Sequence, residues 1–252
     1  MIKSFFKALS LTDWRKIAIR YMFCPVCASK RPMIRLNTNE ISVRCLSCRA
    51  SAITMSLVTV LRRIVPDLGN KEVYELSSRG ALYNFLTRNS KKLTFSEFYK
   101  DVPPGDYFHG IQCQDVQNLT YDNESFDLCT STEVFEHVPD DLKGFSEISR
   151  VLRPPGVFIF TVPLSNRFET IERARLSSGG EIEHLLPPEY HMDPIRGHKP
   201  VLSFRNYGQD ITNRLTGQGF YHAEIIVPDK EKDIPWGYAN AVVAAYKGEV
   251  PV

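Results

Sequence analysis

Four cysteines near the N-terminus are the feature that most constrains the fold. They form two C-x2-C pairs separated by seventeen residues: Cys24, Cys27, Cys45 and Cys48. Such pairs let four thiolates surround one Zn²⁺ as a tetrahedron, and an all-sulfur site has no open position for catalysis. The polar stretch between the pairs is typical of a hairpin. The sequence therefore predicts a zinc ribbon over residues 21–50, with a metal that is structural.

Disulfides are the alternative use of these cysteines. Only Cys113 and Cys129 remain as further partners, and both lie in apolar, strand-like segments. A redox C-x-x-C motif follows a strand of a βαβ unit, which neither pair does. Zinc is the interpretation that we carry forward.

The N-terminal segment favours an amphipathic helix over residues 1–20. Met1 to Leu11 is apolar, but charged residues follow too soon for a secretion signal. No stretch approaches the roughly 18 apolar residues that a membrane span needs. Thiolates available for zinc, together with no secretion signal, predict a cytoplasmic protein without a transmembrane segment.

Charge is distributed unevenly along the chain. Residues 1–63 contain twelve Lys or Arg against two acidic residues, whereas the remainder has a net charge of −8. A basic module beside an acidic body indicates an anionic partner such as RNA, a nucleotide-sugar or a lipid head group. Docking of the ribbon on its own acidic domain explains the same asymmetry.

The rest of the chain alternates strand-like and helix-like segments, which is typical of a parallel α/β sheet. We expect a linker helix within 51–69 and a further domain over 70–252, with a cap insertion at about 164–204. The expected strands are 73–76, 93–96, 110–113, 126–130, 157–162, 223–227 and 239–245. The expected helices are 80–87, 140–152 and 207–218.

Two motifs carry a resemblance to a known family. They are Asn123–Asp141, which contains the strand start Phe126-Asp127, and Ile148–Gly156, which ends in Arg-Pro-Pro-Gly. In these blocks and in element order the chain resembles class I S-adenosylmethionine-dependent methyltransferases of the type 11 kind. The resemblance implies a Rossmann-like, seven-stranded sheet and S-adenosylmethionine as cofactor.

The resemblance also implies the cofactor residues. Three acids fall at successive strand ends, where open α/β sheets bind ligands. Of these, Glu75 would orient the loop and the methionine end, Glu97 would bind the ribose and Asp115 the adenine amino group. The remaining positions carried over are Ser77, Arg79, Gly80, Phe98, Val116 and Ser131. The loop departs from the family because it is poor in glycine, which restricts how closely its backbone approaches the ligand.

An E-x-x-E-H motif follows the strand at 126–130. On a helix Glu133 shares a face with Glu136 and His137. The motif is similar to that of ubiquinone-pathway O-methyltransferases and small-RNA 2′-O-methyltransferases, where it binds a divalent ion. Three roles stay open: a catalytic Mg²⁺ or Mn²⁺ site, a general base at His137, and a structural contact. In the cap, His191 is the best second base or fourth ligand.

The acceptor is the least determined part. A base-modifying methyltransferase would carry an Asn/Asp-Pro-Pro-Tyr/Phe type of sequence where this chain has Ser131-Thr-Glu-Val-Phe. We therefore expect O-methylation of a sugar, glycan or small metabolite. The alternatives are an RNA methyltransferase that uses the basic ribbon, and a cofactor-binding or scaffold protein without activity.

Overall fold

The computed structural model describes residues 17–37, 42–193 and 199–249. The helix expected over residues 1–20 lies mostly outside these ranges. Where that range is described it is wrong, because strand β1 (Ala18–Cys24) already begins at Ala18.

The cysteine-rich module is a small antiparallel sheet of order β1-β2-β3, with β2 at Ser29–Arg35 and β3 at Val43–Cys45. The first cysteine pair lies at the turn between β1 and β2. The predicted hairpin between the two pairs is present, because β2 pairs with β3 and places Met33 opposite Cys45.

The central sheet confirms the predicted α/β class. Within the described residues it has six strands in the order β16-β17-β9-β8-β4-β5. The bounds are β4 Glu72–Glu75, β5 Lys92–Phe95, β8 Phe126–Thr132, β9 Leu152–Thr161, β16 His222–Ile226 and β17 Val242–Tyr246. β5, β4, β8 and β9 run parallel, whereas β17 is antiparallel to both of its neighbours. The carboxyl ends of the four parallel strands therefore meet at one edge.

The strand expected over 110–113 differs from the prediction. Ile111–Gln112 (β7) instead folds back on Tyr107–Phe108 (β6) as an antiparallel hairpin. Its turn contains His109 and Gly110, both at positive φ. Beyond it, Cys113 makes one parallel bridge to Glu97, which is all that the described residues provide at the seventh position of the sheet.

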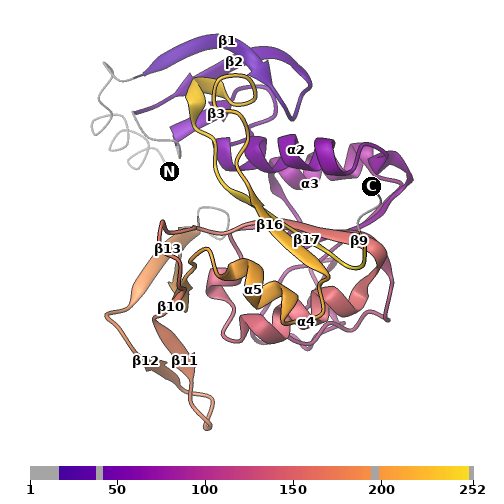
Figure 1. Cartoon of the computed structure of the whole chain (residues 1–252), viewed down its shortest axis with the longest axis vertical. Helices are drawn as coiled ribbons and strands as arrows, with labels where there is room; N and C mark the ends of the chain where they lie inside the picture. The colour runs from indigo at the N-terminus through magenta and orange to yellow at the C-terminus, as the bar shows by residue number, and fades with distance from the viewer. Residues whose placement is uncertain (1–16, 38–41, 194–198, 250–252) are drawn as a thin grey trace.

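Helices cover both faces of the sheet (Figure 1). α2 (Ala52–Ile64) and α3 (Gly80–Asn89) lie on one face; α4 (Asp141–Val151) and α5 (Ile211–Thr216) lie on the other. Ser51 caps α2 by accepting a hydrogen bond from the Thr54 N–H at 3.2 Å. The helix expected within 51–69 is present as α2, and its residues Leu57, Val58 and Leu61 are buried in a core cluster with strands of the sheet.

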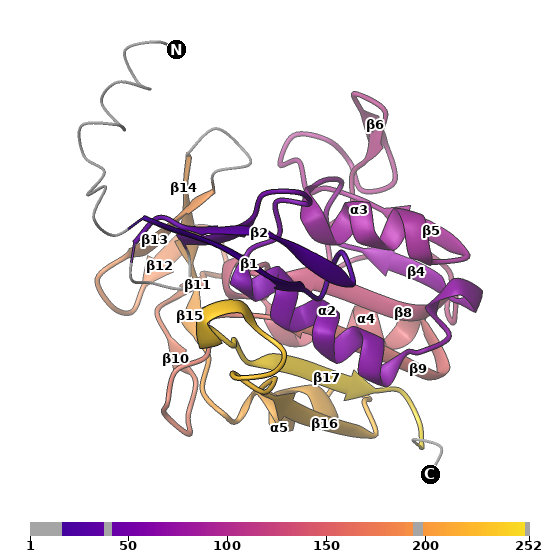
Figure 2. The same cartoon turned by 90° about the horizontal axis from the view of Figure 1, so that it is seen from above.

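The cysteine module is fixed to the body rather than tethered to it. Met33 and Cys45 pack with Met55 of α2 and with Ile234, in the segment between β16 and β17 that Figures 1 and 2 show reaching the module. The Arg62 guanidinium donates to the Pro25 carbonyl at 3.1 Å. Docking of this module on its own domain is therefore part of the fold.

The predicted cap follows β9 and contains three short antiparallel pairs. β10 (Ile171–Glu172) pairs with β15 (Arg205–Asn206), β11 (Ala174–Leu176) with β12 (Ile182–His184), and β13 (Glu189–Asp193) with β14 (Lys199–Ser203). The helix expected from 207 begins only at Ile211, because Tyr207 is buried and bonded to α4 through its hydroxyl. None of the helices in the described parts of the chain is long and apolar enough to cross a membrane.

Candidate functional site

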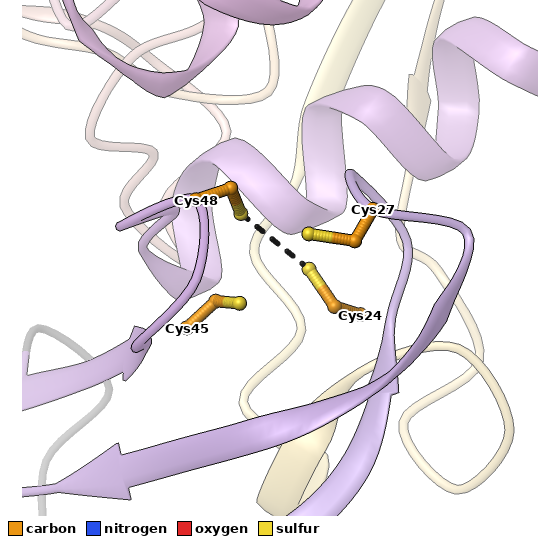
Figure 3. A group of neighbouring side chains, drawn as sticks. All are labelled: Cys24, Cys27, Cys45 and Cys48. Atoms are coloured by element: carbon orange, nitrogen blue, oxygen red, sulfur yellow. Dashed lines mark hydrogen bonds between the residues drawn. The ribbon is translucent and has the colours of Figure 1, made fainter.

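The four cysteines come together as predicted (Figure 3). One sulfur from each lies within 4.8 Å of the others, and the Cys24 and Cys48 sulfurs are 3.7 Å apart. A tetrahedron of thiolates at about 2.3 Å from Zn²⁺ has edges of about 3.8 Å. All four cysteines are free of disulfides. The donor set and its spacing thus fit a closed zinc site.

At the carboxyl edge of the sheet, Glu75 ends β4 with 1% of its surface exposed. Its carboxylate accepts a hydrogen bond from the Thr130 hydroxyl of β8. Burial raises the pKa of Glu75 to about 8, against the Thr130 hydrogen bond, which lowers it. The structure thus shows this acid bonded across the sheet.

Glu97, beyond the end of β5, faces the loop that follows β4. One carboxylate oxygen accepts from the Ser78 backbone N–H at 3.0 Å and from the Ser78 hydroxyl at 2.9 Å. The Arg79 guanidinium lies 3.7 Å from the same oxygen. The loop between β4 and α3 therefore contacts the carboxylate expected to bind ribose.

Asp115 is held by its own turn. It accepts from the Gln117 backbone N–H at 2.9 Å and from the Gln117 side-chain amide at 3.0 and 3.3 Å. Val116 beside it is buried in the core, whereas Phe98 is 50% exposed. An exposed aromatic ring next to Glu97 can stack on a flat heterocycle.

The remaining predicted cofactor residues differ in exposure. Ser77 is partly buried, while Arg79 and Gly80 are exposed at the start of α3. Gly80 has φ +99°, and a Cβ there would meet nothing within 4 Å, so its glycine serves backbone conformation rather than close packing. Ser131 of β8 is fully buried, and its hydroxyl has no hydrogen-bond partner.

Beyond β8, the 3₁₀ turn η4 (Phe135–His137) carries two of the expected catalytic residues. Glu136 is 1% exposed, and both of its carboxylate oxygens are buried without a hydrogen bond. The His137 Nε2 and His191 Nδ1 atoms lie 3.6 and 3.7 Å from one of these oxygens. The three side chains form a group whose ligand atoms lie within 4.8 Å of one another.

Each histidine has its other ring nitrogen at an acceptor. Nδ1 of His137 is 2.8 Å from the Leu202 carbonyl, and Nε2 of His191 is 3.3 Å from the Glu189 carboxylate. Such outer acceptors fix the tautomer that leaves the inner nitrogen free for a cation. The Glu136 carboxylate raises the pKa of His191 above its usual value, against partial burial.

Glu133 corrects the predicted motif. We expected it to share a helical face with Glu136 and His137, but it precedes η4 in a left-handed conformation with φ +52°. Its backbone N–H donates to the Thr161 carbonyl at 2.9 Å. The spacing rule for a helix does not apply, and His191 of the cap completes the group instead.

The orphaned oxygens of Glu136 test the cation hypothesis, because a buried carboxylate without a partner is costly. Two imidazoles and one carboxylate suit Mn²⁺ or a similar divalent ion, so the donor set fits. S-adenosylmethionine fits less directly, since Ser78 and Gln117 already bond Glu97 and Asp115. Each acid still has lone pairs to offer, because a carboxylate accepts about four hydrogen bonds.

Three residues near the site were not predicted from the sequence. Ser78 and Gln117 bond the expected cofactor acids, and Arg205 bonds three backbone carbonyls in and just after η4. The signal for Arg205 was present, since it is a charged residue between the buried aromatics Phe204 and Tyr207.

Comparison with known proteins finds similarity to methyltransferases. Residues 78–160 match the methyltransferase domain model of the Methyltransf_11 family. The chain is 38% identical over 50 residues to a ubiquinone biosynthesis O-methyltransferase from Coxiella burnetii, covering 20% of this chain and 21% of that protein. It is 31% identical over 105 residues to a phthiotriol/phenolphthiotriol dimycocerosates methyltransferase from Mycobacterium tuberculosis, covering 36% and 37% of the two chains.

The chain thus spans about a fifth to a little over a third of these relatives. A solved S-adenosylmethionine-dependent methyltransferase from Mesorhizobium loti aligns over 79% of this chain and all of its own, with TM-score 0.48 and 17% identity. The matched residues run from the loop before α3 to near the end of β9. Residues 78–160 are therefore similar to a methyltransferase domain, and they lie in a Rossmann-like α/β sheet that is preceded by a four-cysteine module.

Proposed function

We propose that this chain is an S-adenosylmethionine-dependent methyltransferase that methylates a hydroxyl oxygen of a sugar, glycan or small metabolite. The match over residues 78–160 supports the methyltransferase part. Glu97, Phe98 and Asp115 support cofactor binding, because they offer two carboxylates and an exposed ring beside one sheet edge. The partial match to an O-methyltransferase supports oxygen as acceptor.

The observation that carries the choice of acceptor is the group Glu136, His137 and His191. We propose that it binds Mg²⁺ or Mn²⁺ through the Glu136 carboxylate, His137 Nε2 and His191 Nδ1. Such an ion lowers the pKa of a hydroxyl bound to it. An amino-nitrogen acceptor has no need of this group, whereas a hydroxyl of ordinary pKa does.

The protein's own contribution is alignment. S-adenosylmethionine would supply the methyl group: a C–O bond would form at the acceptor oxygen as the C–S bond of the sulfonium breaks, and the hydroxyl proton would leave to a base. With an ion bound, both inner ring nitrogens are ligands and the proton leaves to water; without one, His137 or His191 is the base, since each is only partly buried and faces Glu136. Holding the acceptor oxygen, the methyl carbon and the sulfur in line would supply most of the rate.

Calorimetry with S-adenosylhomocysteine tests the cofactor half, and titration with Mn²⁺ tests the cation half. We expect both ligands to bind the wild type. We expect Glu97→Ala and Asp115→Ala each to weaken the binding of S-adenosylhomocysteine by about 1–3 kcal/mol. Absence of binding at millimolar ligand would overturn the enzyme proposal and leave a scaffold protein. Binding of the cofactor analogue without Mn²⁺ would leave His137 or His191 as a plain base.

RNA is a second candidate acceptor, and one observation favours it. Tyr21 and Phe23 of β1 are 68% and 49% exposed, and the exposed Lys30 of the paired strand β2 lies opposite Phe23. Neighbouring aromatic and basic side chains can stack on bases and neutralise phosphates. An RNA affinity that falls steeply between low and physiological salt would support RNA as the acceptor, and a weak, salt-insensitive affinity would support the metabolite.

For either acceptor we propose a reducing, cytoplasmic location, because the cysteines form no disulfides.

A further inference from the structure

The cap and the η4 turn are joined by a dense set of contacts around one buried arginine. Arg205 lies in β15, at the end of the cap, with 3% of its surface exposed. Its guanidinium donates to the carbonyls of Phe135 at 3.1 Å, Val138 at 2.5 Å and Pro139 at 2.7 Å. These three carbonyls bracket Glu136 and His137 in the chain.

The residues just before Arg205 bond the same turn. The Phe204 N–H donates to the Glu136 carbonyl at 2.7 Å, and the Leu202 carbonyl faces His137 Nδ1 at 2.8 Å. Residues 202–205 therefore form a strap, a continuous segment that bonds the backbone of the turn and the His137 ring. A 3₁₀ turn of three residues has few hydrogen bonds of its own, so outside partners decide how well it is fixed.

The strap also relates the turn to His191. β14 ends in the strap and pairs with β13, which places His191 opposite Val201. The Glu189 carboxylate at His191 is itself bonded by Asn206, directly after Arg205, at 3.2 Å. The position of His191 relative to Glu136 and His137 is thus set across the same few residues.

We propose that Arg205 is a positioning residue, which fixes the η4 turn so that Glu136 and His137 face His191. A guanidinium suits this task because its planar array of donors reaches several carbonyls at once. Two acids balance its charge: Glu172 lies 3.1 Å and Asp141 3.6 Å from Nε. The inference rests on the cation site proposed above, but the contacts of Arg205 with the turn do not require an ion.

Arg214 provides a matched control. It bonds the same two acids, Asp141 at 2.6 Å and Glu172 at 3.0 Å. Its described hydrogen bonds include none to η4. Both Arg205→Lys and Arg214→Lys therefore disturb the ion pairs with Asp141 and Glu172. Only Arg205→Lys also removes the guanidinium hydrogen bonds to the η4 turn.

The experiment compares both variants with wild type in three measurements: Mn²⁺ binding by electron paramagnetic resonance, S-adenosylhomocysteine binding by calorimetry, and amide hydrogen exchange of residues 134–139. For Arg205→Lys we expect Mn²⁺ affinity to fall about tenfold or more, as for other residues that orient metal ligands. We also expect faster amide hydrogen exchange in residues 134–139 and an unchanged affinity for S-adenosylhomocysteine. Arg214→Lys should match wild type in all three.

Equal behaviour of the two variants in Mn²⁺ binding and in exchange would overturn the proposal, since both would then act only through general stability. Loss of S-adenosylhomocysteine binding in Arg205→Lys would overturn it as well. If wild type binds no Mn²⁺, the cation site fails separately, and the exchange comparison alone decides the role of Arg205.

Discussion

Ser78 donates both its backbone N–H and its hydroxyl to one oxygen of Glu97, at 3.0 and 2.9 Å. This carboxylate is the one proposed to bind the ribose of the cofactor. Ser78 therefore occupies part of the hydrogen-bonding capacity that Glu97 would offer to the ligand. Glu97 is 6% exposed, so few water molecules can donate hydrogen bonds to its carboxylate.

Ser78→Ala should therefore tighten the binding of S-adenosylhomocysteine by about fivefold, because one competing hydrogen bond of about 1 kcal/mol is removed. Calorimetry measures this directly. Ser90→Ala is the matched control, since its hydroxyl bonds the Leu86 carbonyl at the far end of α3 and not Glu97. Weaker binding by Ser78→Ala would mean that its hydroxyl orients Glu97 rather than competes for it.

The cysteine module, with zinc bound, should stabilise the fold without taking part in methyl transfer. Protein purified without chelator should contain one zinc per chain. Cys24→Ser should lower the zinc content and reduce the melting temperature by about 5 °C or more. The reason is that Cys24 is fully buried in the cluster that joins the module to α2. Cofactor affinity should change little.

Cys113→Ser is the control for that experiment. Cys113 is also buried, but its sulfur contacts the Tyr99 and Val102 carbonyls far from the cysteine cluster. Its zinc content should equal that of the wild type. A wild-type protein that contains no zinc by elemental analysis would contradict the structural-metal assignment.

Glu75 should make stability depend on pH. Its pKa is raised from 4.5 to about 8 in the folded chain, so the folded state holds a proton that the unfolded state releases. The free energy of unfolding should fall as pH rises from about 4.5 to 8, by at most about 1.4 kcal/mol per pH unit from this group. Glu75→Gln removes the ionisation and should flatten that part of the profile.

Denaturant unfolding between pH 5 and 9 measures the effect. Glu231→Gln, at an exposed position, should leave the profile of the wild type unchanged. Parallel profiles for wild type and Glu75→Gln would show that Glu75 ionises normally despite its burial.

The group around η4 separates a cation from a plain base. If Glu136 is a ligand, Glu136→Gln should reduce Mn²⁺ affinity at least tenfold, since it removes the only carboxylate in the group. Glu133→Gln should have a smaller effect, because Glu133 lies outside that group. Activity should also vanish with EDTA and return with Mn²⁺ or Mg²⁺.

Zinc content measured in the same samples is the control, because four thiolates should retain their ion under mild chelation. EDTA-resistant turnover in the wild type, with Glu136→Gln unaffected, would end the cation hypothesis. His137 and His191 would then be tested as bases through the pH dependence of turnover.

The sequence predicted well what depends on local pattern. The spacing of the cysteines led to a cluster that the structure confirms, and alternating apolar segments led to the parallel strands β4, β5, β8 and β9. Glu75 ends β4, and Glu97 follows β5 after one intervening residue.

Prediction was less successful where distant segments decide the geometry. Glu133 was placed on a helix because its spacing suits one, but a hydrogen bond to Thr161 of β9 holds it in a left-handed conformation. The strand at 110–113 became a hairpin through a turn at His109 and Gly110. The role of Arg205 depends on carbonyls about seventy residues earlier, which no local pattern reveals.

The position of the insertion between β9 and α5 has a consequence for how acceptor choice can vary. The acids proposed to bind the cofactor come from residues 75–115, whereas His191 and the strap come from residues 189–205. The two reactants would thus be handled by separate stretches of one chain. Exchanging the β13–β14 hairpin between related proteins, with Arg205 kept, would then change the acceptor without altering residues 75–115, which are proposed to bind the cofactor.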